Sequence, residues 1–183
     1  MKEENCIILD FLPSGYADRR HAEPMAQAIG TNLFTLLELV PRETVSLKPE
    51  EEVYIGEGKR DKIKFIKGQL EYENLTNMAM SSLTFTIEMI VKKNESVFVD
   101  FFNKAGIITP RLHKFQLLPG IGKKHLLDIL DERKKKPFDS FDDMVKRVKF
   151  FPDPVKIIVR RVETEIKGEE KYHLFTMQPR RKF

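Results

Sequence analysis

A run of six residues, Pro-Gly-Ile-Gly-Lys-Lys at positions 119–124, lies between two apolar segments and has the residue types needed to hold an anion. Gly120 and Gly122 permit positive backbone angles and close approach of the main chain, and Ile121 is available to fill the crevice beside the turn. A helix that begins after the second glycine would direct its unpaired N–H groups, its dipole and the side chains of Lys123 and Lys124 toward one point. This arrangement predicts an anion site suited to a phosphodiester. The alternative is a plain tight connection with solvated lysines.

The charge of the chain is divided unevenly along its length. The formal net charge is +4 over 183 residues. Residues 1–108 carry 13 Lys and Arg against 17 Asp and Glu, a balance of −4, whereas residues 109–183 carry 19 against 11, a balance of +8. Such a split indicates a polyanion-binding segment attached to a roughly neutral scaffold, although a Lys- and Glu-rich chain is also typical of adaptation to high temperature.

Other site chemistries find little support in the residue pattern. The single cysteine, Cys6, lies in an apolar run and is expected to pack as a small hydrophobe. The four histidines are scattered without metal-ligand spacing, so we expect no metal and no cofactor. Asp10 and Asp18 are two isolated acids and do not make a two-metal nuclease site. The apolar runs are too short to span a membrane, and the first residues lack the features of a signal peptide, which predicts a cytoplasmic protein without membrane contact.

Short runs of β-forming residues predict a small barrel at the start of the chain. They are bounded by Pro, Gly and charged residues and lie at 6–12, 32–40, 51–58 and 61–72. Four strands in so short a stretch favour a barrel over a sheet with helical crossovers. The long connection between the first two strands is expected to hold a short helix at 23–29.

The hydrophobic period then changes from two to between three and four, which predicts helices. Two helices are expected first, one with apolar residues from Leu75 to Ile90 and one from Val97 to Ala105. Gly106 stands where a left-handed cap would end the second.

Clear boundary signals predict four more short helices after residue 108. Thr109-Pro110 and Asp153-Pro154 pair a cap with a proline in the first turn, and Ser140 with Asp143 resembles a capping box. The four helices are expected at 110–118, 123–134, 141–149 and 154–167, the last closed by Gly168. A strand-like run at 171–177 is expected to return to the barrel.

Leu118 to Leu130 resembles the helix-hairpin-helix family of nucleic-acid-binding motifs, in which Leu-Pro-Gly-Ile-Gly precedes basic residues and a Leu- and Ile-rich helix. The similarity extends through residues 131–148, which look like the linker and connecting helix of tandem helix-hairpin-helix domains. The second hairpin departs from the pattern, because Pro152-Asp153-Pro154 replaces the expected glycines and lysine. Since Asp153 would repel phosphate, we expect the second unit to be structural.

As a whole, the chain resembles an archaeal family of uncharacterised proteins predicted to bind nucleic acid. The resemblance implies an α+β fold, with a small OB-like β-barrel that carries a helical insertion, a helix-hairpin-helix segment and a returning C-terminal strand. The corresponding domains are residues 1–108, residues 109–170 with a degenerate second hairpin, and residues 171–183 with the strand and a basic tail.

Further candidate contacts lie outside the hairpin. Arg133 and Lys135 belong to a basic run that either binds the ligand or complements the dipole at a helix C-terminus. Arg19 and Arg20 lie in the loop after the first strand. The aromatic residues that could stack on bases, but that more often serve as core or rim packing, are Tyr16, Tyr54, Phe65 and Tyr72.

The sequence therefore predicts a protein that binds nucleic acid without catalysis. RNA is favoured over DNA, because the resemblance implies a translation- or rRNA-linked role and OB-like domains suit single-stranded or structured RNA. The expected partners are nucleic acid and possible ribosomal or rRNA-processing proteins. Two alternatives stay open. The first is a DNA-binding or DNA-repair protein of the glycosylase or nuclease type, in which Lys124 and Asp142 would correspond to the lysine nucleophile and aspartate of helix-hairpin-helix glycosylases. The second is a protein-interaction module on the ribosome.

Overall fold

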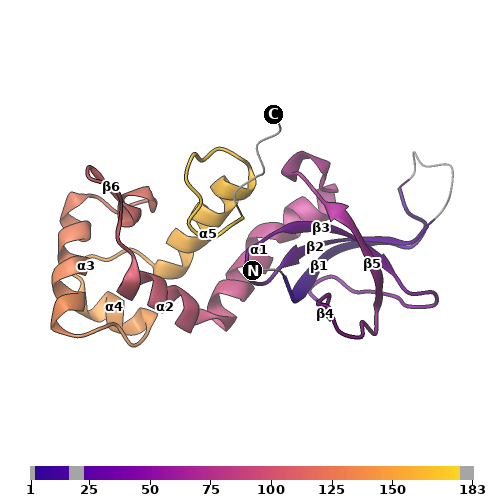
Figure 1. Cartoon of the computed structure of the whole chain (residues 1–183), viewed down its shortest axis with the longest axis horizontal. Helices are drawn as coiled ribbons and strands as arrows, with labels where there is room; N and C mark the ends of the chain where they lie inside the picture. The colour runs from indigo at the N-terminus through magenta and orange to yellow at the C-terminus, as the bar shows by residue number, and fades with distance from the viewer. Residues whose placement is uncertain (1–2, 17–22, 178–183) are drawn as a thin grey trace. The chain divides into compact units, whose positions relative to one another are not determined.

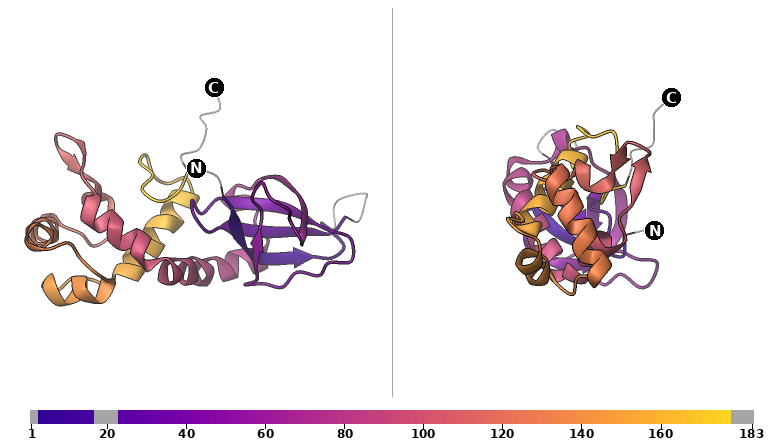
Figure 2. Two further views of the ribbon diagram at one scale, coloured as in Figure 1. Left: turned by 60° about the horizontal axis from the view of Figure 1, so that its bottom comes forward. Right: turned by 90° about the vertical axis from the view of Figure 1, so that its left-hand side faces the viewer.

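The computed structural model describes residues 3–16 and 23–177. The chain divides into two compact units: unit 1 combines Met1–Thr86 with Thr164–Phe183, and unit 2 is Ile87–Glu163. Figures 1 and 2 show strands gathered in unit 1 and mainly helices in unit 2. The changes between units fall inside two helices, α1 (Asn77–Lys93) and α5 (Pro154–Ile166). The predicted domain boundaries, after residues 108 and 170, lie elsewhere.

Unit 1 is built on a curled, five-stranded antiparallel half-barrel with the strand order β4-β1-β2-β3-β5 (Figure 1). The strands are β1 (Asn5–Leu12), β2 (Met25–Gly30), β3 (Leu36–Pro41), β4 (Glu52–Tyr54) and β5 (Ile63–Gln69). The register shifts between Ile8 and Asp10 in β1 and at two places where β3 pairs with β5, at which the extra residues belong to β5. Such irregularities bend a strand and increase its twist, which helps the sheet to curl. The expected mixed α+β class and barrel-like sheet are confirmed.

The strand β2 corrects the expectation of a helix at 23–29. Its sequence, MAQAIG, contains residues that favour helices, but all six residues are buried between β1 and β3. Ala26 and Ala28 face the inner core with Cys6 and Ile8. Tertiary pairing at a central position of the sheet therefore outweighs the local propensity.

A buried glutamine joins the sheet to the start of α1. Gln27 is fully buried, and its side-chain amide donates to the Asn74 carbonyl at 3.0 Å while its oxygen accepts from Thr76 N at 2.8 Å. Thr76 Oγ1 also donates to Asp10 Oδ2 at 2.7 Å. The short 3-10 helix η1 (Tyr72–Asn74) and the first turn of α1 are thus fixed to the sheet.

The C-terminal segment of unit 1 contains no strand within the described residues up to 177, so the predicted strand at 171–177 is wrong. The buried carboxylate of Glu165, near the end of α5, instead accepts the backbone N–H groups of Leu174, Phe175 and Thr176 at 2.7, 3.0 and 2.9 Å. Three N–H groups that would have entered a sheet are satisfied by one side chain. The segment closes back on α5 as an irregular loop.

Unit 2 begins with the end of α1 and continues through short elements around an aromatic core. These are α2 (Glu95–Lys104), β6 (Ile107–Thr109), β7 (Leu112–His113), η2 (Lys114–Leu117), α3 (Lys123–Lys135), α4 (Phe141–Arg147) and the first part of α5. The rings of Phe102 and Phe115 are stacked at 5.5 Å between centroids, and Phe151 meets Phe102 edge-on at 6.0 Å. This cluster forms the centre of the unit.

The predicted helix at 110–118 is wrong, because this segment forms the β6–β7 hairpin and a four-residue 3-10 helix. His113 caps η2: its Nδ1 accepts from Phe115 N at 3.1 Å, and its own N–H donates to the Gln116 side chain at 2.7 Å. Side-chain capping of so short a segment favours the tight 3-10 turn over an α-helix that continues from Pro110.

Most of the other expected helix boundaries are confirmed. Ser140 Oγ accepts from Asp143 N at 3.1 Å, and Asp153 Oδ1 accepts from Val155 N at 2.9 Å. Gly168 has a positive φ of 72°. Gly106 is not among the residues with positive φ in the described chain, so its predicted role as a left-handed cap is wrong.

We expect the hydrogen bonds of Glu165 to stabilise unit 1. Glu165→Gln replaces one accepting oxygen by an NH₂ group, which leaves buried N–H groups of residues 174–176 without an acceptor. We expect a loss of about 1–3 kcal/mol in the free energy of unfolding, measured by chemical denaturation, with faster amide exchange at residues 174–176. Glu169→Gln, an exposed change three residues from the end of α5, is the control. Equal stability of the two variants would contradict the assigned role.

The buried imidazole of His113 predicts a pH dependence in unit 2. Burial and the nearby charges of Arg133 and Lys114 lower the pKa of His113 below its ordinary value of 6.5. Because the unfolded chain binds this proton more readily, stability should fall as the pH drops below about 6.5 toward the folded-state pKa. Amide exchange of residues 115–118 should therefore be faster at pH 5.5 than expected from intrinsic rates. His113→Gln should reduce this dependence, and an unchanged dependence in that variant would argue against His113 as its source.

Candidate nucleic-acid interface

Two buried apolar side chains anchor the turn that precedes α3 to the core of unit 2. Leu118 and Ile121 are 2% and 6% exposed, and Ile121 N donates to the Leu118 carbonyl at 3.2 Å. Gly120, between them, has a φ of 82°, a left-handed conformation that a glycine adopts without a steric cost. Ile121 therefore lies inward as expected, while both flanking glycines are left at the surface.

The first turn of α3 offers N–H groups and positive charge to solvent. Gly122 is the N-cap, and because it has no side chain, no side-chain cap takes the first N–H groups. Lys123 and Lys124 are exposed, and among the described residues neither forms an ion pair. The N–H groups, helix dipole and lysine charges expected at this turn are thus brought together. The chain enters the turn from η2, not from an α-helix.

A second turn, before α5, repeats the backbone geometry of the first. Phe150 has a φ of 55°, as Gly120 has a φ of 82°. Phe151 N donates to the Val148 carbonyl at 3.3 Å, and Phe151 is buried at 7% exposure, so it corresponds to Ile121. The sequence did not reveal this equivalence, because a phenylalanine stands where the first turn has glycine.

The two turns adjoin. A methyl group added at Gly120 would lie 3.7 Å from Pro152 Cγ. His125, in the first turn of α3, places its Nε2 3.1 Å from the Phe150 carbonyl. One surface of unit 2 therefore presents both turns and the N-terminus of α3.

The second helix start differs chemically from the first. Asp153 Oδ1 accepts from Val155 N at 2.9 Å and from Lys156 N at 3.3 Å. The carboxylate occupies the position that an anionic ligand would take at the start of α5. Of the two turns, only the one at Gly122 leaves the helix N–H groups without a side-chain cap.

The other predicted contacts have different surroundings. The guanidinium of Arg133 donates to the carbonyls of Phe102 and Ala105 at 3.0 and 2.8 Å, which caps the C-terminus of α2. Lys135 is exposed and pairs with Glu132 at 2.6 Å. Both belong to the far end of α3 from Lys123 and Lys124. Arg19 and Arg20 lie outside the described residues.

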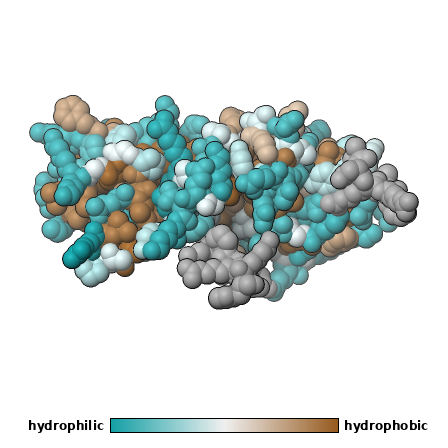
Figure 3. Space-filling view, turned by 90° about the horizontal axis from the view of Figure 1, so that it is seen from above, coloured by the Kyte–Doolittle hydropathy of each residue, from teal (hydrophilic) through white to brown (hydrophobic). Residues whose placement is uncertain are grey.

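Exposed apolar side chains accompany the charges of unit 2. Figure 3 shows apolar side chains gathered among hydrophilic ones on the face of this unit that is seen from above. The large exposed ones in the described part of unit 2 are Val97, Ile107, Leu127, Val145 and Phe150. Phe150 is the most exposed of them at 88%.

Unit 1 offers a less favourable surface for a polyanion. Phe65 and Tyr54 are 41% and 40% exposed, but the lysines of and beside β5 are matched by acids: Lys62 with Glu51, Lys64 with Glu43 at 3.8 Å and Lys67 with Glu38 at 3.9 Å. The hydroxyl of Tyr16 accepts from Gln27 Nε2 at 2.8 Å, and Lys167 Nζ lies 5.3 Å from the centre of the Tyr72 ring. Tyr16 and Tyr72 therefore have packing partners, as expected for core or rim residues.

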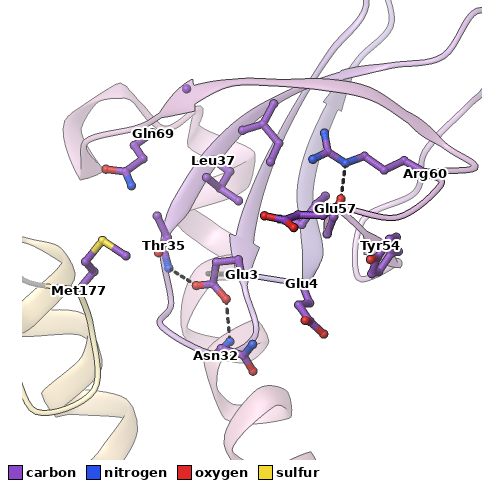
Figure 4. Close-up of a pocket in the computed structure, with 14 residues that line it drawn as sticks. Glu3, Glu4, Asn32, Thr35, Leu37, Tyr54, Glu57, Arg60, Gln69 and Met177 are labelled. Atoms are coloured by element: carbon purple, nitrogen blue, oxygen red, sulfur yellow. Dashed lines mark hydrogen bonds between the residues drawn. The ribbon is translucent and has the colours of Figure 1, made fainter. Parts of the chain in front are cut away.

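A cavity of about 1000 Å³ opens in unit 1 between the edge strands β4 and β5 (Figure 4). Glu3, Glu4 and Glu57 contribute three carboxylates to its wall against the single guanidinium of Arg60. The Glu3 carboxylate already accepts the backbone N–H groups of residues 32, 33 and 35 at 2.9, 2.9 and 3.1 Å. This acidic lining disfavours a phosphate group in the cavity.

Two broader features concern the described residues alone. Residues 3–16 and 23–177 contain no group of three or more His, Cys, Asp or Glu side chains placed to hold a metal ion. Across the same residues, every helix is too short or too polar to cross a membrane.

Comparison with known proteins places the whole chain in one family. The family model described as "Protein of unknown function (DUF655)" matches residues 2–177. The chain is 43% identical over 175 residues to the uncharacterized protein MJ0038 of Methanocaldococcus jannaschii, which covers 94% of this chain and 79% of that protein. The crystal structure of Af1531 from Archaeoglobus fulgidus, which carries the same family designation, is 45% identical with a TM-score of 0.86, and the match covers 96% of this chain and 100% of that one. The expected resemblance to uncharacterised archaeal proteins is confirmed, and the chain belongs to the DUF655 family.

Proposed function

We propose that this protein binds nucleic acid, with RNA as the favoured ligand, by holding the phosphate backbone at the turn before α3. The observation that carries the proposal is the N-terminus of α3. Its N-cap, Gly122, provides no side-chain cap, the next two residues are exposed lysines, and the preceding Ile121 is buried. A phosphodiester accepts hydrogen bonds from such N–H groups and gains from the helix dipole and the lysine charges. The contact reads no bases.

The fold supports the proposal in two ways. A five-stranded, partly open barrel is also the architecture of OB-like domains, a class that includes RNA-binding proteins, although the acid-paired lysines of and beside β5 lead us to place the contact in unit 2. The turn at 118–124 keeps the buried apolar plug and flanking glycines of a helix-hairpin-helix motif, although η2 replaces the first helix. The OB-like and helix-hairpin-helix assignments are part of the proposal.

The proposed role is binding without catalysis. The alternative of a DNA-repair enzyme would require Lys124 to form a covalent adduct with damaged or abasic DNA. Borohydride trapping of such an adduct, or metal-dependent cleavage of RNA, would contradict our proposal. The alternative of a ribosomal protein-interaction module predicts binding to ribosomal proteins in the absence of RNA.

The phosphate contact predicts a change in salt dependence. Combined Lys123→Glu and Lys124→Glu should weaken binding to every oligonucleotide about equally, because a backbone contact carries no sequence information. The slope of log affinity against log salt should become shallower by about one to two units, as expected for one or two lost phosphate contacts. Fluorescence anisotropy at several salt concentrations, on RNA and DNA oligonucleotides, measures both effects.

A matched control is available on the same helix. Combined Lys134→Glu and Lys135→Glu changes the charge by the same amount at the other end of α3, where these lysines pair with Asp131 and Glu132 at 3.5 and 2.6 Å. We expect a much smaller change in slope. An unchanged slope for the Lys123 and Lys124 variant, with its fold intact by circular dichroism, would return the turn to a purely structural role.

The second turn provides a further comparison. Asp153→Asn keeps an oxygen to cap α5 but removes the negative charge beside the proposed site. Binding should be unchanged or slightly tighter, because Asp153 repels phosphate but no phosphate is expected at α5 itself. Weaker binding in this variant, measured by the same titration, would show that Asp153 contributes to the ligand contact.

A further inference from the structure

Phe150 combines high exposure with an unfavourable backbone conformation. The residue is 88% exposed and its φ is 55°, in the left-handed region that a bulky residue rarely adopts. The equivalent position in the first turn is Gly120, which adopts this conformation without strain. At this exposure the ring buries little surface. A strained residue without a packing role is a candidate for function.

The backbone that carries Phe150 is fixed by contacts of its own carbonyl and of the next residue. Phe151 is buried and its N–H donates to the Val148 carbonyl at 3.3 Å. Its ring packs edge-on against that of Phe102, with 6.0 Å between the ring centroids. The Phe150 carbonyl lies 3.1 Å from His125 Nε2. The exposed ring therefore projects from an anchored turn, and less conformational freedom is lost when a flat partner binds it.

The acid of this turn, Asp153, caps the start of α5, and three lysines accompany the Phe150 ring. Lys149 precedes it, and Lys123 and Lys124 begin the helix whose first turn contacts the Phe150 backbone. None of these three lysines forms an ion pair within the described part of the chain. Aromatic rings beside cations suit single-stranded nucleic acid, in which phosphates meet the cations and base faces are free to stack. In a duplex the base faces are covered by their neighbours.

We propose that Phe150 stacks on an unpaired base of the nucleic acid whose phosphate is held at Gly122, Lys123 and Lys124. This inference rests on the proposed function and deepens it: the ligand is a single strand, or a structured RNA with a loop or bulge at this surface. The first turn holds the backbone, and the second supplies the stacking platform.

The absence of tryptophan from the sequence permits a direct test. Phe150→Trp introduces a single indole, whose fluorescence should be quenched when a short single-stranded RNA is added and much less when a blunt duplex is added. Val97→Trp, at a position in α2 that is 64% exposed, provides the control and should show little quenching. In anisotropy titrations, Phe150→Ala should weaken single-strand binding by about 5- to 150-fold and duplex binding far less. Phe65→Ala, an exposed aromatic in unit 1, should leave the affinity unchanged.

The outcomes separate this inference from the proposed function. If the wild-type protein binds no nucleic acid, the proposed function fails and the inference fails with it. If the wild type binds with a salt slope that depends on Lys123 and Lys124, but the indole of Phe150→Trp is not quenched and Phe150→Ala binds normally, only the stacking role is overturned. A blue shift of that indole on raising the protein concentration without oligonucleotide would assign Phe150 to self-association, and would also overturn it. Unchanged thermal midpoints for Phe150→Ala exclude unfolding as the cause of weaker binding.

Discussion

The packing of Phe102 against Phe115 and Phe151 is the interaction on which both surface turns depend. Phe115 stacks on Phe102 at 5.5 Å, and its carbonyl accepts from Leu118 N at 3.0 Å, where the first turn begins. Phe151 meets the same ring at 6.0 Å and belongs to the second turn. Because Phe102 is fully buried at the end of α2, its removal would loosen both turns together. The core of unit 2 therefore positions the surface that we assign to the ligand.

The two turns show how similar backbones can carry different chemistry. Both have a left-handed residue followed by a buried apolar side chain. In the first, glycine at the N-cap leaves the helix N–H groups without a side-chain acceptor, whereas Asp153 accepts two of them in the second. The second turn instead exposes Phe150. The sequence suggested that the second hairpin, which departs from the helix-hairpin-helix pattern, is purely structural. We instead propose a binding role for it, through Phe150.

Local signals in the sequence predicted most helices, while tertiary contacts decided the elements that were missed. Ser140, Asp153 and Gly168 act within one helical turn, so their effects are visible in the sequence. The strand β2 depends on neighbours on both sides, and the loop at 171–177 depends on Glu165, a residue several positions earlier. Lys123 and Lys124 were predicted as site residues from the Pro-Gly-Ile-Gly-Lys-Lys pattern. The left-handed backbone of Phe150 did not, because no local rule places an aromatic residue there.

Mapping of the bound surface by NMR is the most direct test of phosphate binding at the turn before α3. Backbone amide shifts of ¹⁵N-labelled protein would be followed while a short single-stranded RNA is added. We expect the largest changes on residues 120–125, with further changes at 149–151, and little change in the amides of β4, β5 and the acidic cavity. Large changes confined to unit 1, with the turn before α3 unaffected, would rule out this turn as the binding site.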